Sequence, residues 1–266
     1  MDDSSSFLAG TKSDQNLAND LVRLADRSHD LGQEVYQLYR QYLTALAKAL
    51  RHNSIQSCYH LCTSCYPLEF LELEPSQQQR LQRSLRRAIT NSIIDLLRQL
   101  QPIADVPSPL ELSAWLHNIE EAIGLTLPGL SKKMNYLLQQ ARVVPQQVPR
   151  QLIEAAVKAD DISDSGGAKR PNILSVLVEK DSNDDPENTV IIPVHVIFLR
   201  LAEIEFAEIE LSKLRHQIHE IRSKVADLRR TYKHRQHQAQ GKAAAAAWHQ
   251  SWFGSEDQET PSSEPG

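Results

Sequence analysis

The sequence predicts an all-α protein, a multi-helix domain with two long antiparallel heptad helices and one minor β-hairpin. Glycine is scarce, at 9 of 266 residues, and strands and tight turns rely on glycine, whereas a helix loses about 1 kcal/mol for each glycine relative to alanine. Prolines separate segments rich in leucine, alanine, glutamine, arginine and glutamate, which are good helix formers. A seven-residue hydrophobic repeat also recurs near each end of the chain.

The first half of the chain is predicted to hold a helical domain at 14–158, after a disordered N-terminus at 1–13. Within that domain, helices are expected over 14–66, 75–100, 109–123, 128–141 and 145–158. All but the first begin at a proline, which is tolerated at the first helical position because that N–H has no intrahelical partner.

The second half is predicted to contain a loop with a β-hairpin, a long coiled-coil helix with an aromatic end, and a disordered acidic tail, at 159–193, 194–253 and 254–266. The hairpin is indicated by β-branched runs at 173–178 and 190–192, separated by turn-forming residues at 181–186. The tail is rich in acidic residues, proline and serine, a composition typical of disorder.

The last predicted helix carries an a/d repeat of apolar residues held over about five heptads. Its a positions are Ile197, Ile204, Leu211, Ile218, Val225 and Tyr232, and its d positions are Ala207, Leu214, Ile221 and Leu228, with the polar Arg200 at one further d position. The first helix has a similar but wider stripe, which suggests that it also faces the central helices. That stripe runs through Leu17, Leu21, Leu24, Ser28, Leu31, Val35, Leu38, Tyr42, Ala45 and Ala49.

Charge along these two helices predicts their relative direction. In the last helix, 197–210 holds four glutamates against one arginine, and 213–235 holds eight lysines and arginines against two acids. In the first helix, 14–34 holds five acids against two arginines, and 35–52 holds three basic residues. An antiparallel arrangement places each acidic half against a basic half, either between first and last helix of one chain or between the last helices of a dimer.

Three cysteines have the spacing C-x3-C-x2-C, at Cys58, Cys62 and Cys65. This spacing holds an iron–sulfur cluster in radical S-adenosylmethionine enzymes, but the βα alternation of those enzymes is missing on both sides. The three positions also share one face of a helix, and free cysteine is among the most buried residue types. The sequence therefore favours core cysteines, with a zinc or redox site including His60 or His52, or a cluster, as alternatives.

Two aromatic and basic features indicate binding surfaces. Trp248, Trp252 and Phe253 come after the alanine tract at 243–247. We expect them to dock in a partner groove or at a membrane interface, or to fold back onto the body. Basic faces lie on the last helix, over Lys213–Lys242, and on the second helix, which carries Arg80, Arg83, Arg86 and Arg87. The face on the last helix indicates a nucleic-acid surface, an anionic-lipid surface or a solvated helix face. The face on the second helix indicates a nucleic-acid surface or a solvated helix face.

Composition and motifs exclude several classes of protein. The net charge of −5 excludes a globally basic nucleic-acid binder. No phosphate-binding glycine loop, G-x-S-x-G or H-E-x-x-H motif is present, so no cofactor is expected. No window approaches the roughly 20 apolar residues of a membrane span, and the acidic start MDDSSSFLAG is unlike a secretory signal, so we expect a cytoplasmic protein.

A segment of the first third, 24–73, resembles an uncharacterised family of helical proteins from cyanobacteria. The similarity centres on VYQLYRQYL at 35–43 and on YHLC at 59–62. The resemblance implies a helical fold and no particular activity.

The leading hypothesis is a non-catalytic scaffold or adaptor that acts through coiled-coil and helix-mediated protein interaction or self-association. Its partner-binding residues would be Ile204, Leu211, Leu214, Ile218, Ile221, Val225, Leu228, Trp248, Trp252 and Phe253. A nucleic-acid-associated regulator using the basic helix faces is the alternative. A metal or iron–sulfur enzyme centred on Cys58, Cys62, Cys65 and His60 is the third.

Overall fold

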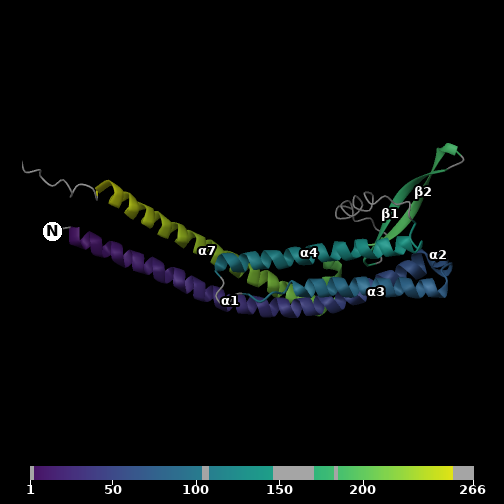
Figure 1. The fold of residues 1–266 in the computed structure, drawn as a ribbon, viewed down its shortest axis with the longest axis horizontal. Helices are drawn as coiled ribbons and strands as arrows, with labels where there is room; N and C mark the ends of the chain where they lie inside the picture. Colours follow the sequence, from purple (N-terminus) through teal and green to yellow (C-terminus); the bar gives the residue numbers. More distant parts are fainter. Residues whose placement is uncertain (1–2, 104–107, 146–170, 183–184, 254–266) are drawn as a thin grey trace, which may run out of the picture. The chain divides into compact units, whose positions relative to one another are not determined.

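The computed structural model describes residues 3–103, 108–145, 171–182 and 185–253, which form helices and one two-stranded antiparallel sheet (Figure 1). In chain order the elements are α1 (Asp3–His60), the π-helix η1 (Leu61–Cys65), α2 (Pro67–Leu71), α3 (Pro75–Arg98), α4 (Pro109–Gln140), β1 (Ile173–Ser182), β2 (Asp185–Ile197), α6 (Leu201–Ala207) and α7 (Ile209–Phe253). The predicted class, all-α with a small hairpin, is therefore confirmed.

The chain divides into two compact units. The first unit consists of Met1–Val35, Ile103–Leu116 and Glu220–Gly266. The second consists of Tyr36–Pro102 and His117–His219. Helices α1, α4 and α7 each contribute residues to both units.

The first unit is built from the beginnings of α1 and α4 and the later part of α7. Its buried apolar side chains are Leu17, Leu31, Val35, Leu112, Leu116, Ile221, Val225 and Leu228. Polar contacts join the three helices at their edges: Arg235 of α7 pairs with Asp20 of α1 at 3.4 Å, and Arg229 donates to Ser113 of α4 at 3.1 Å. Burial of each large apolar side chain contributes roughly 1.5–3 kcal/mol, so the apolar contacts supply most of the stability here.

The second unit has the larger core, formed by α1, α3, α4, α6 and the start of α7. Its fully buried large side chains include Tyr39, Tyr42, Leu43, Leu46 and Leu50 of α1 and Ile123, Leu130, Met134 and Leu138 of α4. The apolar stripe of α1 is thus wider than its heptad positions alone, as the sequence predicts. The buried stripe of α3 consists of Leu81, Leu85, Ala88, Ile89, Ile93 and Leu96.

Helices α1 and α7 contact each other with opposite chain directions. In the first unit, Asp20 of α1 pairs with Arg235 of α7. In the second unit, Tyr42, further along α1, contacts Arg215, which is earlier in α7. The position on α7 therefore decreases as that on α1 increases, which is the antiparallel order, and both contacts lie within a single chain.

We expect energy transfer between dyes on Asn16 and Lys233 to be efficient in a dilute monomer, because both exposed residues flank the Asp20–Arg235 pair. The measurement is single-molecule FRET on the doubly labelled chain. Mixing two singly labelled chains is the control, and it should give no transfer. Transfer that appears only in the mixture, or grows with protein concentration, would assign the helix pairing to a dimer.

Helix α4 is a single helix, although the sequence predicts two helices at 109–123 and 128–141. Pro128 lies inside α4 and removes one backbone hydrogen bond from it. The buried neighbours Leu127 and Leu130 hold the helix against the core on both sides of the proline. Tertiary packing therefore outweighs the helix-breaking tendency of proline at this position.

The hairpin is longer than predicted, and the prediction of one continuous helix at 194–253 is wrong at its start. Strand β2 continues to Ile197, and the first helical residue is Leu201. The helix is then interrupted at Glu208, which has an extended backbone between α6 and α7. The β-branched residues Val194, Val196 and Ile197 pair with β1 instead of extending the heptad repeat.

The ends of several other predicted segments also differ or cannot be compared. Helix α1 begins at Asp3, within the segment 1–13 for which disorder is predicted. At its other end α1 gives way to η1, in which the Tyr66 N–H donates to the Leu61 carbonyl five residues earlier. The predicted helix at 145–158, most of the loop at 159–172 and the acidic tail at 254–266 lie outside the described residues.

Candidate functional site

The heptad residues of α6 and α7 are buried by the chain itself. Ile204, Leu211, Leu214, Ile218, Ile221, Val225 and Leu228 are all less than a tenth exposed. These side chains are predicted to bind a partner, and within the single chain they pack inside their own units. The repeat correctly marks a buried helix face, and the assignment of these seven positions as a partner surface stays a prediction.

The residues at the end of α7 are exposed to solvent. All residues from 241 to 252, named here the α7 end segment, are exposed, including the five alanines at 243–247. Alanine has the highest helix propensity, and this segment continues a packed helix, so no new helix has to be nucleated. These two effects explain how the segment remains helical without packing contacts to a core. Phe253 is the last residue of α7 and its side chain is not among those described.

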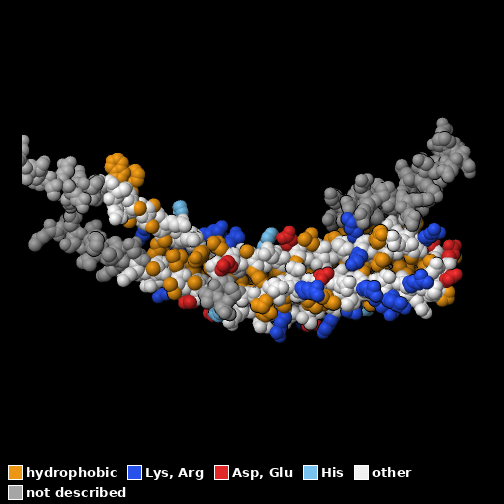
Figure 2. All heavy atoms as spheres, viewed as in Figure 1, with side chains coloured by type: hydrophobic (Ala, Val, Ile, Leu, Met, Phe, Trp, Pro, Cys, Tyr) orange, Lys and Arg blue, Asp and Glu red, His pale blue; other side chains and the backbone are white. Residues whose placement is uncertain are grey.

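Trp248 and Trp252 form a stacked pair on the α7 end segment. Their ring centroids are 5.3 Å apart with an interplanar angle of 30°, and the two residues are 61% and 63% exposed. Figure 2 shows hydrophobic side chains gathered at this end of α7. The alternative in which these tryptophans fold back onto the body is therefore not the arrangement observed.

A groove of about 600 Å³ lies beside the α7 end segment in the first unit. It is lined by Asn16, Leu17, Asp20, Arg235, Gln238, Gly241, Lys242 and Ala245. The Asp20–Arg235 ion pair lies in this groove, and both side chains are more than a third exposed. The lining of the groove thus combines the Asp20–Arg235 ion pair with the small residues Gly241 and Ala245 of α7. Ala245 belongs to the alanine tract that precedes the tryptophan pair.

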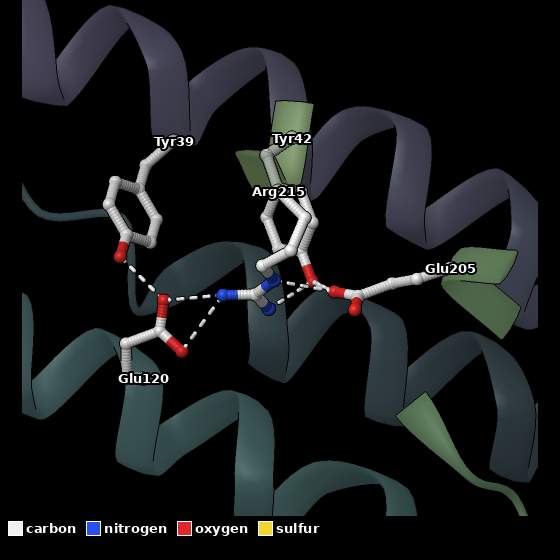
Figure 3. A network of polar contacts seen from close by, with 5 residues as sticks. All are labelled: Tyr39, Tyr42, Glu120, Glu205 and Arg215. Atoms are coloured by element: carbon white, nitrogen blue, oxygen red, sulfur yellow. Dashed lines mark hydrogen bonds and ion pairs between the residues drawn. The ribbon is translucent and has the colours of Figure 1, made fainter. Parts of the chain in front are cut away.

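A cluster of charged and phenolic side chains, named here the Arg215 network, lies inside the second unit (Figure 3). The Arg215 guanidinium pairs with Glu120 of α4 at 2.8 Å and with Glu205 of α6 at 2.7 Å. Its carbon lies 4.5 Å from the centroid of the Tyr42 ring, a cation–π contact. Tyr39 donates a hydrogen bond to Glu120, and Tyr42 donates one to Glu205. Arg215 thereby joins its own helix, α7, to α1, α4 and α6.

Burial and charge shift the pKa values of Tyr42 and Arg215 in the Arg215 network. Burial raises the pKa of Tyr42 far above its ordinary value, although the Arg215 cation opposes this rise. Burial by itself would lower the pKa of Arg215, but Tyr42, Glu120 and Glu205 outweigh it and raise that pKa. The arginine therefore remains charged and the phenol neutral near neutral pH, so the cluster suits a structural role and not proton transfer.

Buried amides and hydroxyls fasten the base of the hairpin to the helices of the second unit. The Asn135 side chain donates to the Ile197 carbonyl and accepts from the Ile197 N–H, both at 2.8 Å. The Ser131 hydroxyl accepts from the Leu199 N–H at 2.9 Å. These bonds satisfy buried backbone groups at the end of β2 and just after it.

Asn172 completes this attachment just before β1. Its φ of 60° is in the left-handed region, which asparagine tolerates better than most residues. Its side chain donates to Asn53 of α1 at 3.1 Å and accepts from the Arg200 N–H at 3.2 Å. On the other side of the hairpin base, the Tyr66 hydroxyl accepts from the His195 N–H at 2.8 Å. The hairpin is therefore oriented by polar contacts to α1 and α4.

The three cysteines do not come together as metal ligands. Cys62 is buried, and Cys58 lies 3.8 Å from the sulfur of Met134. Burial raises the pKa of Cys58 to about 12 and that of Cys62 to about 11, so both remain thiols near neutral pH. In the described ranges, no group of three or more His, Cys, Asp or Glu side chains could hold a metal ion, the neighbourhood of His60 included.

The basic residues of the predicted nucleic-acid faces have different environments. On α7, Arg215 is half-buried in its network. Arg229 donates a hydrogen bond to Ser113, and Arg230 forms an ion pair with Asp227. The histidines at 216, 219, 234 and 237 are exposed. On α3, Arg80, Arg83, Arg86 and Arg87 are all exposed.

Sequence reasoning missed the roles of Arg215, Glu120 and Asn135. Arg215 occupies the heptad position directly after Leu214, a position that commonly forms interhelical ion pairs. That signal could have suggested an ion pair, but the partners are 95 and 10 residues away in sequence. Asn135 lies among buried leucines on α4, and a buried amide on a helix indicates a hydrogen-bonding role without naming the partner.

The geometry defines a predominantly helical protein with a polar-anchored hairpin and an exposed aromatic helix end. No protein-family model, curated protein or solved structure matches this chain. Across the described ranges, no helix has both the length and the hydropathy needed to cross a bilayer.

Proposed function

We propose that this protein is a non-catalytic scaffold or adaptor that holds a protein partner through the α7 end segment. The stacked, exposed pair of Trp248 and Trp252 carries this proposal. Tryptophan is the residue type most enriched among those that dominate binding energy at interfaces. Two tryptophans held in fixed positions on a helix lose little conformational entropy when they bind.

The chemistry of the segment indicates what kind of surface it fits. The alanines at 243–247 carry minimal side chains, so a partner helix can approach the α7 backbone closely along this stretch. The tryptophans then provide the large apolar area, about 150–250 Å² for each ring. The partner surface is therefore an apolar helix or groove with pockets for two aromatic rings.

The rest of the chain serves in this proposal as a rigid support. The Arg215 network joins α1, α4, α6 and α7 through ion pairs and hydrogen bonds. The bonds from Asn135 and Ser131 fasten the hairpin base. These internal contacts stabilise the second unit, in which α7 begins.

The test places a photoreactive amino acid at position 248 of the full-length chain in cells. We expect irradiation to yield a specific cross-linked adduct, whose second component is identified by mass spectrometry. The matched control carries the same photoreactive residue at Lys224, an exposed position on α7 outside the segment. With the identified partner, replacing either tryptophan by alanine should weaken binding about 30-fold, equivalent to about 2 kcal/mol.

Equal adducts at positions 248 and 224, or none at 248, would contradict the proposal. An adduct between two copies of this chain would identify the partner as a second copy, which equilibrium sedimentation then measures directly.

A further inference from the structure

Helix α3 carries four arginines on one face, named here the arginine face of α3 and formed by Arg80, Arg83, Arg86 and Arg87. All four are exposed, and none makes an ion pair or hydrogen bond with another residue in the described ranges. Figure 2 shows Lys and Arg side chains gathered over α3. At 1.5 Å per residue, the four cations lie along roughly 10 Å of helix.

The fold fixes the direction in which this face points. The opposite side of α3 is buried through Leu81, Leu85, Ala88, Ile89, Ile93 and Leu96, so the helix cannot rotate about its axis. Its start is also fixed: Glu74 and Gln77 form a capping box, and the Gln78 amide donates to the carbonyls of Phe70 and Leu73. The arginines therefore form a stationary array.

The array contains uncompensated like charges. Arg83 lies three or four residues from each of the other three, spacings at which side chains on a helix meet and like charges repel. The only acidic residue within α3 is Asp95, which pairs with Arg98 at 3.2 Å. Arg215, by contrast, is compensated by two carboxylates. An anionic ligand would relieve the repulsion on α3.

We propose that the arginine face of α3 binds the phosphodiester backbone of a nucleic acid without reading its sequence. The planar guanidinium matches phosphate oxygens in a bidentate manner, and α3 contains arginine and no lysine. The exposed amides of Gln79, Gln82 and Asn91 on the same helix add uncharged donors, which commonly contact phosphates. A duplex presents one negative charge per roughly 1.7 Å of its axis, which is dense enough to engage all four cations.

A membrane surface fits this helix less well. An amphipathic helix binds a bilayer by inserting its apolar face, and the apolar face of α3 is already buried in the second unit. Only surface attraction to anionic headgroups would remain, without the apolar insertion that anchors such helices in a bilayer.

The experiment measures binding of the full chain to labelled duplex DNA and duplex RNA of mixed sequence by fluorescence anisotropy. With four phosphate contacts, affinity should fall about a hundredfold as salt rises from about 50 to about 200 mM, and it should not depend on sequence. The variant in which all four arginines become glutamine should lose this binding and its salt dependence. Because these side chains have no partners, the variant should keep the wild-type circular dichroism spectrum and unfolding midpoint.

A matched variant removes four charges from α7 instead, with Lys224, Arg229, Arg230 and Lys233 replaced by glutamine. It changes the net charge by the same amount, and it should bind nucleic acid as the wild type does. Unchanged binding by the α3 variant, or equal loss in the α7 variant, would overturn the proposal. Stronger binding to phosphatidylserine vesicles or to polyglutamate than to either duplex would also overturn it.

Discussion

Replacing Arg215 with methionine is expected to lower the free energy of unfolding by about 3 kcal/mol, since one partner of a largely buried ion-pair cluster is removed. Glu120 and Glu205 are only 19% and 15% exposed, and both would be left without their cation. Methionine retains much of the side-chain length, so loss of charge and not loss of volume dominates. Urea denaturation monitored by circular dichroism gives the change.

Two comparisons isolate the cause of that loss. Arg230→Met removes an arginine that pairs with Asp227, but these side chains are 80% and 68% exposed, so the change should be below about 0.5 kcal/mol. Adding Glu120→Gln and Glu205→Gln to Arg215→Met should recover part of the lost stability, because no unpaired carboxylate then remains. Equal destabilisation by Arg215→Met and Arg230→Met would show that the network contributes no more than a surface pair.

Replacing Asn135 with alanine is expected to cost about 3 kcal/mol of unfolding free energy, because two buried backbone groups each lose a hydrogen bond worth about 1–3 kcal/mol. The groups are the N–H and the carbonyl of Ile197, a residue that is only 1% exposed. Denaturant unfolding measures the total loss. Hydrogen exchange at Ile197 and Leu199 should also accelerate, because Asn135 and Ser131 hold this segment.

The control is Lys133→Ala, two residues away on α4, where the side chain is exposed. It should change stability by less than about 0.5 kcal/mol, as surface substitutions usually do. Asn135→Asp should destabilise at least as much as the alanine variant, since it keeps the acceptor for the Ile197 N–H but sets a buried carboxylate oxygen against the Ile197 carbonyl oxygen. Unaltered exchange at Ile197 in the alanine variant would mean that the hairpin base is held by other contacts.

Much of the helical architecture could be predicted from the sequence because it depends on short-range periodicity. The seven-residue spacing from Ile204 to Leu228 correctly marks a buried face, and the charge order along the two long helices correctly gives their antiparallel direction. Periodicity, however, does not say which molecule covers a buried face. The heptad residues are covered by this chain's own helices, which spacing alone could not distinguish from a partner.

The errors arise where distant contacts outweigh local preference. Ile197 fits the heptad repeat, but pairing with Ile173 and the Asn135 side chain place it in a strand. Pro128 remains inside α4 because its neighbours are buried. The Arg215 network joins residues up to 173 positions apart, and no window of sequence contains that information.

The length of the alanine tract before Trp248 sets both the distance of the two tryptophans along the helix axis and their direction around that axis. One residue added to an α-helix advances the remainder of that helix by about 1.5 Å and turns it by about 100°. Inserting a single alanine among positions 243–247 would therefore rotate both indole rings about the helix axis and hardly change their distance from the folded part of the chain. Inserting seven alanines would move the rings roughly 10 Å further along the helix axis and leave them on almost the same side of the helix. Length changes in this tract could thus redirect the protein toward different neighbours without disturbing the folded body.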